Sequence, residues 1–114
     1  MKKGYYLSSC STCKRILSEI ENDDFDLQDI KNDEITEEQV EQMAELSGSY
    51  ESLFSRRAQK YKEMGLKDKK LEEQDYKKLI LEHYTFLKRP VFVVGEKIYV
   101  GNSKKVVAEL VSDL

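Results

Sequence analysis

Two cysteines set three positions apart are the residues of this sequence best suited to chemistry. Cys10 and Cys13 are the only cysteines of the chain, and they stand in the run Cys-Ser-Thr-Cys. A cysteine is nucleophilic as its thiolate, and this spacing places the second sulfur about one helical turn from the first. Three interpretations follow: a redox or nucleophilic pair, part of a metal site, or two cysteines that only pack in the core.

The flanking residues place Cys10 at the junction of a strand and a helix. Residues 4–7 (GYYL) predict a short buried strand, and residues 13–20 carry apolar side chains at helical spacing. A thiol in the first turn of a helix lies beside unpaired backbone N–H groups and the positive end of the helix dipole, which lowers its pKa. Helix starts also hold anions, so Ser11 and Thr12 in this turn are candidate oxyanion-binding residues.

The metal and packing interpretations have less support. A structural zinc site usually takes four Cys or His ligands, whereas this chain has two cysteines and one histidine, His83, far away in the sequence. Packing applies mainly to Cys13, which falls on the apolar stripe of its helix. For a Cys-x-x-Cys at the start of a helix between strands, we favour the redox or nucleophilic interpretation and expect no metal site.

The rest of the chain predicts an α/β protein. Residues 21–24 (ENDD) end the first helix and residues 25–30 predict a second strand, so the chain begins strand–helix–strand with parallel strands. Further helical segments are predicted over residues 37–46 with Thr36 as N-cap, over residues 50–65, and over residues 71–87. A hairpin around Gly95 and a closing helix capped by Ser103 complete the pattern.

Length, composition and charge narrow the class of protein. The 114 residues are 39% hydrophobic and 36% charged, which predicts one ordered domain over residues 1–114. The order of the predicted elements places a helical insertion over residues of about 34–87, between the two groups of strands. A net charge of −3 disfavours direct nucleic-acid binding. No run approaches the ~20 apolar residues that span a bilayer, and no apolar signal segment opens the chain. We therefore expect a cytoplasmic protein without membrane contact, in which structural disulfides are rare.

Arginines are the candidate anion-binding side chains. Arg89 precedes Pro90, the only proline, at the start of a predicted strand. A guanidinium fixed beside a thiolate would bind an oxyanion through two hydrogen bonds and lower the thiol pKa. Sequence pattern alone favours a trans peptide here, because only about 5–6% of X–Pro bonds are cis. Arg56 and Arg57 stand in a basic segment that is ordinarily a solvated helix face.

Taken together, these residues resemble the arsenate reductase–like (ArsC/Spx) family. The resemblance covers essentially the whole chain and rests on three stretches: SSCSTCKRIL, SRRAQKYKEMGL and EHYTFLKRPVFVVGEKIYVG. Its most specific part is the run His-x-x-x-Leu-x-Arg-Pro that begins at His83. The resemblance implies a thioredoxin-like fold with a small mixed sheet and an inserted helical lobe.

The resemblance also implies roles for particular residues. Cys10 matches the reactive cysteine, and Arg89 matches an arginine that helps to bind the oxyanion. Pro90 matches a proline that is cis in this fold. Arg57 matches an arginine of the Spx-like branch, with Arg56 as the second choice.

The activity implied is that of a thiol-dependent reductase. Cys10 would attack an oxyanion or a disulfide, and Cys13 would resolve the adduct. Glutathione, glutaredoxin or thioredoxin would restore the dithiol, and no bound cofactor is needed.

An alternative within the same resemblance is a Spx-like redox-sensing transcription regulator that binds the RNA polymerase α subunit. The stretch YVGNSKK, residues 99–105, lacks the arginine that glutaredoxin-coupled reductases carry there, and those reductases usually work with one cysteine. Gly48 falls where the regulators have a glycine at their polymerase contact. Glycine as a helix terminator explains Gly48 equally well.

Overall fold

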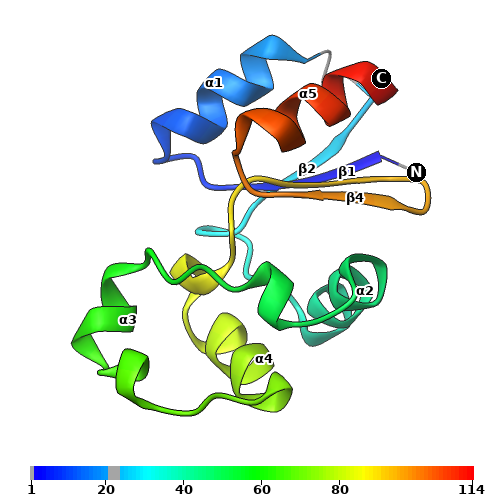
Figure 1. Ribbon diagram of the computed structural model, residues 1–114. Coiled ribbons are helices and arrows are strands. Elements are labelled where there is room, and N and C mark those ends of the chain that lie inside the picture. The colour runs from blue at the N-terminus through cyan, green and yellow to red at the C-terminus, as the bar shows by residue number, and fades with distance from the viewer. Residues whose placement is uncertain (1, 21–23) are drawn as a thin grey trace. The chain divides into compact units, whose positions relative to one another are not determined.

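The structure is a computed structural model that describes residues 2–20 and 24–114. It divides into two compact units (Figure 1). The first unit comprises Met1–Glu34 and Arg89–Leu114, and the second comprises Ile35–Lys88. The prediction of one domain with an insertion over residues of about 34–87 stays a prediction.

A mixed sheet forms the centre of the first unit. Its strands are β1 (Lys2–Tyr6), β2 (Asp26–Asp29), β3 (Val91–Val94) and β4 (Lys97–Val100), in the order β2-β1-β3-β4. β1 pairs in parallel with β2 and antiparallel with β3, and β3 and β4 form the predicted hairpin. The parallel pair requires a crossover, which α1 (Ser11–Glu19) provides. The predicted α/β class with a small mixed sheet is confirmed.

Two helices cover one face of this sheet, α1 and α5 (Lys104–Asp113), which lie side by side in Figure 1. Their buried side chains meet those of the sheet in one apolar cluster, whose members are Ile16, Ile20, Phe25, Phe92, Tyr99 and Leu110. Gly4 of β1 leaves room for this layer, because a Cβ there would lie 2.7 Å from Cδ2 of Leu27. The predicted helix end at residues 21–24 lies largely outside the described residues.

Helices and short 3₁₀ turns make up the second unit. The helices are α2 (Glu37–Ser47), α3 (Gln59–Glu63) and α4 (Glu73–Glu82), and the 3₁₀ turns span Glu51–Leu53, Leu66–Asp68 and Tyr84–Phe86. Phe54 is fully buried, stacks on Phe86 with ring centroids 5.0 Å apart, and meets Tyr76 edge-on at 4.9 Å. These aromatic contacts join the 3₁₀ turns to α4. In the described part of the chain, no helix is both long and apolar enough to cross a membrane.

Several helix ends follow their sequence signals. Thr36 and Gln39 form a reciprocal capping box at the start of α2, and Ser103 accepts a hydrogen bond from the Val106 amide at the start of α5. Gly48 ends α2 in the left-handed conformation, with φ of 105°, and its N–H donates to the Ala44 carbonyl. The predicted role of Gly48 as a helix terminator is confirmed.

Two helix predictions for the second unit are wrong in extent. The helix predicted over residues 71–87 ends at Glu82, because His83 takes an extended conformation. The segment over residues 50–65 contains only a 3₁₀ turn and the short α3, so Arg56 and Arg57 lie in a turn rather than on a helix. Both differences have one cause, which is the backbone pairing of residues 53–55 with residues 86–88. In continuous helices, the backbone N–H and C=O groups of these residues would bond within their own helix, and the pairing between the two segments could not form.

Candidate active site

Cys10 is the N-cap of α1. Its backbone is extended, with φ of −94° and ψ of 113°, while its carbonyl already accepts a hydrogen bond from the Lys14 amide. The Cys10 N–H donates to the Leu7 carbonyl at 2.9 Å, so residues 7–10 form a turn between β1 and α1. Cys10 therefore lies at the strand-to-helix junction, as the sequence predicts.

The surroundings of Cys10 favour its thiolate. Burial alone would raise the pKa of this half-buried thiol, but the backbone amide and thiol of Cys13, the amide of Thr12 and the charge of Arg89 outweigh it and lower the pKa. The Cys10 side chain closes no cap hydrogen bond, so we attribute the effect of the amides to their electrostatic field rather than to a formed cap. No acidic residue stands in the first turn of α1 to offset that field.

Cys13 has the opposite character. Its side chain is completely buried in the third position of α1, and its pKa is raised to about 11, with burial as the largest cause. Hydrogen bonding to Cys10 and the negative charge of Cys10 also contribute to this increase, whereas the Leu7 backbone and Arg89 oppose it without reversing the shift. Both residues are free thiols, and only Cys10 is exposed to attack or alkylation.

Arg89 and Pro90 reach the same region from the neighbouring strand. The Arg89–Pro90 peptide is cis, as the resemblance implies. The Pro90 carbonyl accepts a hydrogen bond from the Gly101 amide at 2.9 Å, and the Arg89 carbonyl accepts one from Asn102 Nδ2 at 3.3 Å. Tyr5 of β1 pairs with Val91 of β3 in the antiparallel ladder, so the C-terminal end of β1 and the N-terminal end of β3 lie at the same end of the sheet.

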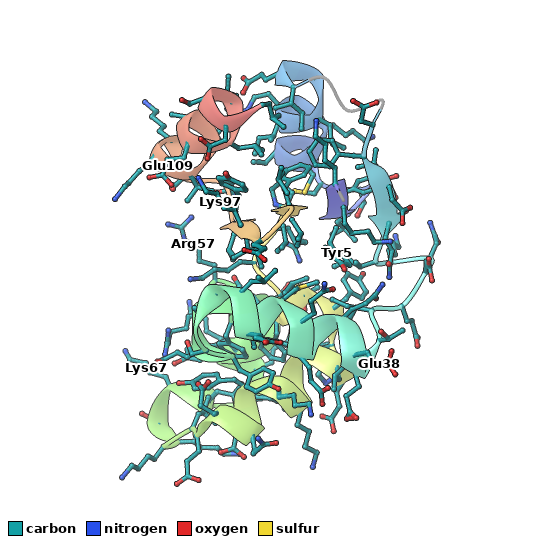
Figure 2. All side chains as sticks on the ribbon, turned by 90° about the vertical axis from the view of Figure 1, so that its right-hand side faces the viewer. Tyr5, Glu38, Arg57, Lys67, Lys97 and Glu109 are labelled. Carbon is teal, nitrogen blue, oxygen red and sulfur yellow. The ribbon has the colours of Figure 1, made fainter. Side chains whose placement is uncertain are left out.

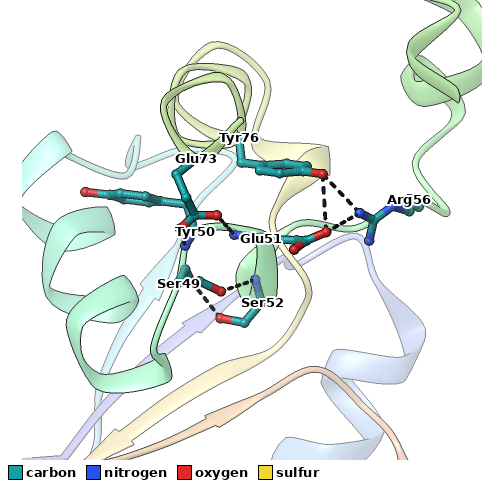
Figure 3. Close-up of polar contacts among 7 residues, drawn as sticks. All are labelled: Ser49, Tyr50, Glu51, Ser52, Arg56, Glu73 and Tyr76. Carbon is teal, nitrogen blue, oxygen red and sulfur yellow. Dashed lines mark hydrogen bonds and ion pairs between the residues drawn. The ribbon is translucent and has the colours of Figure 1, made fainter. Parts of the chain in front are cut away.

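The two candidate arginines of the second unit differ in their contacts. Arg56 Nη2 lies 2.7 Å from Glu51 Oε2 and 3.1 Å from the Tyr76 hydroxyl, which itself hydrogen-bonds Glu51 (Figure 3). Arg57, which is labelled in Figure 2, is exposed, and no hydrogen bond or ion pair to another described residue holds its side chain. Arg56 is therefore engaged within its own unit and Arg57 is not.

The first unit brings together Cys10, Cys13, Ser11, Thr12, Arg89 and Pro90. Arg56, Arg57 and His83 belong to the second unit, where the His83 ring packs edge-on against Phe86 at 5.7 Å. Across residues 2–20 and 24–114, no group of three or more His, Cys, Asp and Glu side chains is placed to hold a metal ion.

Asp29, at the end of β2, is a residue near the site that the sequence analysis missed. Its carboxylate accepts hydrogen bonds from the amides of Ser8 and Lys31 and from the side-chain amide of Asn32. A signal was available, because an Asp that ends a strand parallel to β1 lies at the same sheet edge as the Cys10 turn. Without the register of the strands, that signal could not be tied to Ser8.

Comparison with known proteins identifies the family. The model of the ArsC family matches residues 5–110, which includes every candidate residue of the site. The chain belongs to the ArsC family. The resemblance on which the sequence analysis relied is confirmed, and the chain is a member of a thiol-dependent reductase-like family.

Solved structures extend the likeness to the fold of ArsC proteins. An arsenate reductase from Vibrio cholerae is 20% identical, with a TM-score of 0.80 and 95% of each chain covered. A possible arsenate reductase from Streptococcus mutans is 29% identical, with a TM-score of 0.76, covering 96% of this chain and 97% of that one. An ArsC-related protein from Brucella melitensis is 20% identical, with a TM-score of 0.73, covering 99% and 95%. No curated protein matches the chain. The predicted thioredoxin-like fold of ArsC proteins is confirmed.

Proposed function

We propose that this ArsC-family protein is a cytoplasmic thiol-dependent reductase that uses Cys10 as nucleophile and Cys13 as resolving thiol. The observation that carries the proposal is the contrast between the two thiols. One sulfur is accessible and has a lowered pKa, and the other lies one turn away, fully buried, with a pKa of about 11. A reductase that forms an intramolecular disulfide needs one reactive thiol that attacks the substrate and a second, less reactive thiol that resolves the adduct.

The first step is attack by the Cys10 thiolate. With arsenate, the sulfur bonds to arsenic(V), and an oxygen ligand leaves as water after taking up protons. With a disulfide substrate, the sulfur bonds to one substrate sulfur and the other leaves as a thiolate. Arg89 and the amides of Ser11 and Thr12 would hold the oxyanion during this step. Ser11 and Thr12 are the first residues of α1, and the charge of Arg89 lowers the pKa of Cys10.

The second step is resolution by Cys13. Once Cys10 is bonded to substrate it no longer carries a negative charge, so one of the causes that raise the pKa of Cys13 is removed. The Cys13 thiolate then attacks the Cys10 sulfur, and the electron pair of the bond that breaks passes to the substrate, giving arsenite or a free thiol. The product Cys10–Cys13 disulfide takes back a pair of electrons from glutathione, glutaredoxin or thioredoxin, and no bound cofactor takes part.

The contacts in the second unit favour Arg57 over Arg56 as a further anion-binding residue. Arg56 is committed to Glu51 and Tyr76, whereas the exposed guanidinium of Arg57 is available to a ligand. An arginine that is already paired offers fewer donors to an oxyanion.

Turnover assays test the proposal. Arsenate or a small disulfide is supplied with either glutathione and glutaredoxin or thioredoxin and its reductase. Cys10→Ser is expected to abolish turnover, and Cys13→Ser to stop the reaction at the Cys10 adduct, which intact-mass measurement detects. Ser18→Ala, on the exposed side of α1, is the matched control. Oxidised wild-type protein should lose about two mass units as the pair closes. Full turnover in Cys10→Ser would contradict the proposal.

The Spx-like regulator remains the second candidate. Gly48 is exposed and nothing lies within 4 Å of where its Cβ would stand, so a partner could approach the backbone there. Its capping role accounts for the glycine without a partner. A pull-down of the RNA polymerase α subunit that depends on oxidation of the cysteines and is lost in Gly48→Arg would favour the regulator, together with absence of turnover on every substrate tried.

A further inference from the structure

The carboxylate of Asp29 is joined by hydrogen bonds to the turn that carries Cys10. We infer that Asp29 is a positioning residue for Cys10, which it acts on through Ser8. The inference rests on the proposed function in one respect, namely that Cys10 is the working thiol. It goes beyond that function by naming the residue that sets where the thiol stands.

Asp29 collects its hydrogen bonds at the end of β2. Oδ1 accepts from the Ser8 amide at 3.2 Å and from the Lys31 amide at 3.3 Å, and Oδ2 accepts from Asn32 Nδ2 at 2.8 Å. The Ser8 side chain also lowers the pKa of the carboxylate. The bonds from Lys31 and Asn32 fix the carboxylate within its own turn, so the bond from the Ser8 amide holds a separate segment of the chain.

Ser8 lies in the middle of the turn that places Cys10. The turn begins at the end of β1, where Tyr6 pairs with Asp29 and the Tyr6 carbonyl accepts a hydrogen bond from the Ile30 amide. It ends at Cys10, whose N–H donates to the Leu7 carbonyl. Within the described residues, the bond from the Ser8 amide to Asp29 is the only hydrogen bond that ties Ser8 or Ser9 to another element. Asp29 therefore determines the path of the chain into the N-cap of α1.

The charge of Asp29 and its positioning of Cys10 should act on the pKa of Cys10 in opposite directions. A nearby carboxylate would disfavour the Cys10 thiolate through space, so its removal by itself would lower the thiol pKa. The groups that act on the Cys10 sulfur are the amides of Thr12 and Cys13, the Cys13 thiol and Arg89. If Asp29 holds the sulfur against these groups, its removal raises the pKa instead.

Asp29→Asn tests the inference in the full chain. The rate of Cys10 alkylation by iodoacetamide is measured against pH, with the labelled peptide identified by mass. We expect the apparent pKa to rise and alkylation below the wild-type midpoint to slow roughly three- to tenfold, since one pKa unit changes the thiolate fraction tenfold. Asp26→Asn is the matched control: it removes a charge from the same strand, but its carboxylate bonds Lys3 rather than the Cys10 turn.

The outcomes separate the explanations. An unchanged pKa in Asp29→Asn overturns the inference, and a lowered pKa overturns it by showing a charge effect alone. If Asp29→Asn does not fold, as judged by circular dichroism, Ser8→Ala takes its place, because it removes the side chain that lowers the pKa of Asp29 and leaves the turn and the carboxylate. Ser8→Ala should slow alkylation in the same direction by a smaller factor, and an unchanged profile would overturn the inference.

The alkylation profile needs no substrate, which keeps this inference separate from the proposed function. A raised pKa in Asp29→Asn together with wild-type protein that reduces nothing would leave the inference standing and the proposed function wrong. Cys10-dependent turnover in the wild type, with unchanged pKa and unchanged kcat/KM in Asp29→Asn, would do the reverse.

Discussion

The sulfurs of Cys10 and Cys13 belong to the same turn of α1, yet the pKa of Cys10 is lowered and that of Cys13 is raised to about 11. Arg89 lowers both values, so the difference arises from burial and from the order of the two residues along the helix. The N-cap position gives Cys10 its access to the first amides of the helix, and the third helical position turns Cys13 into the core.

Selective alkylation is the first prediction. At neutral pH iodoacetamide should modify Cys10 and leave Cys13 largely unreacted, because only Cys10 combines exposure with a lowered pKa. Peptide mapping after timed alkylation measures both rates. Equal rates for the two thiols in folded protein would contradict the roles assigned to them.

Arg89→Ala should raise the pKa of Cys10, because the guanidinium charge of Arg89 is among the causes that lower it. The effect should exceed that of Arg57→Ala, whose side chain is exposed in the second unit. Arg89→Lys retains the charge and should restore part of the shift. Thiolate absorbance near 240 nm against pH measures the three variants, and a larger shift in Arg57→Ala would mean that the anion site is misplaced.

Alkaline pH should weaken the fold through Cys13. The pKa of Cys13 in the folded state is about 11, chiefly because of burial, whereas an unfolded cysteine has a pKa of ~8.5. The contribution of the buried thiol to the free energy of unfolding is therefore complete below the unfolded value and is lost as the pH rises towards 11. The loss should be about 1–3 kcal/mol of unfolding free energy. Urea unfolding at pH 8 and pH 10.5 measures it.

Cys13→Ala is the comparison for that experiment. This variant is less stable at both pH values because it loses buried volume, but its stability should fall less between them. Equal falls in the two proteins would show that other groups, such as Tyr99 with its raised pKa, account for the alkaline loss.

Gly4→Ala should destabilise the first unit by about 1–2 kcal/mol, because the added methyl would overlap Leu27 Cδ2 and press on the Phe92 ring. The same change in a Leu27→Ala background should be less harmful, since the shorter side chain leaves space. A double-mutant cycle by urea unfolding measures the coupling. Additive losses would show that the Leu27 contact is not the cause.

Local signals explain why much of the fold could be predicted. The strand–helix–strand start, the hairpin around Gly95 and the caps at Thr36 and Ser103 each depend on residues close together in the sequence. The same is true of Cys10 at the N-cap. Here local preference and tertiary structure agree, which is the usual situation in natural sequences.

Long-range backbone pairing explains what could not be predicted. The helix that stops at Glu82 and the irregular chain around Arg56 depend on hydrogen bonds between residues 53–55 and 86–88, some thirty positions apart. Asp29 was missed for a related reason, since its link to Ser8 exists only once β1 and β2 are in register. Apolar periodicity carries no information about such pairs.

The antiparallel pairing of β1 with β3 has a consequence for how this site can change over time. Cys10 follows the end of one strand and Arg89 precedes the start of the other, so the ladder of main-chain bonds fixes the separation of the Cys10 turn and the Arg89 backbone. Side chains elsewhere on the two strands can drift without altering that separation. In the reductase proposed above, variation in substrate choice would then arise in the surrounding loops, while the backbone preserves the separation of Cys10 and Arg89.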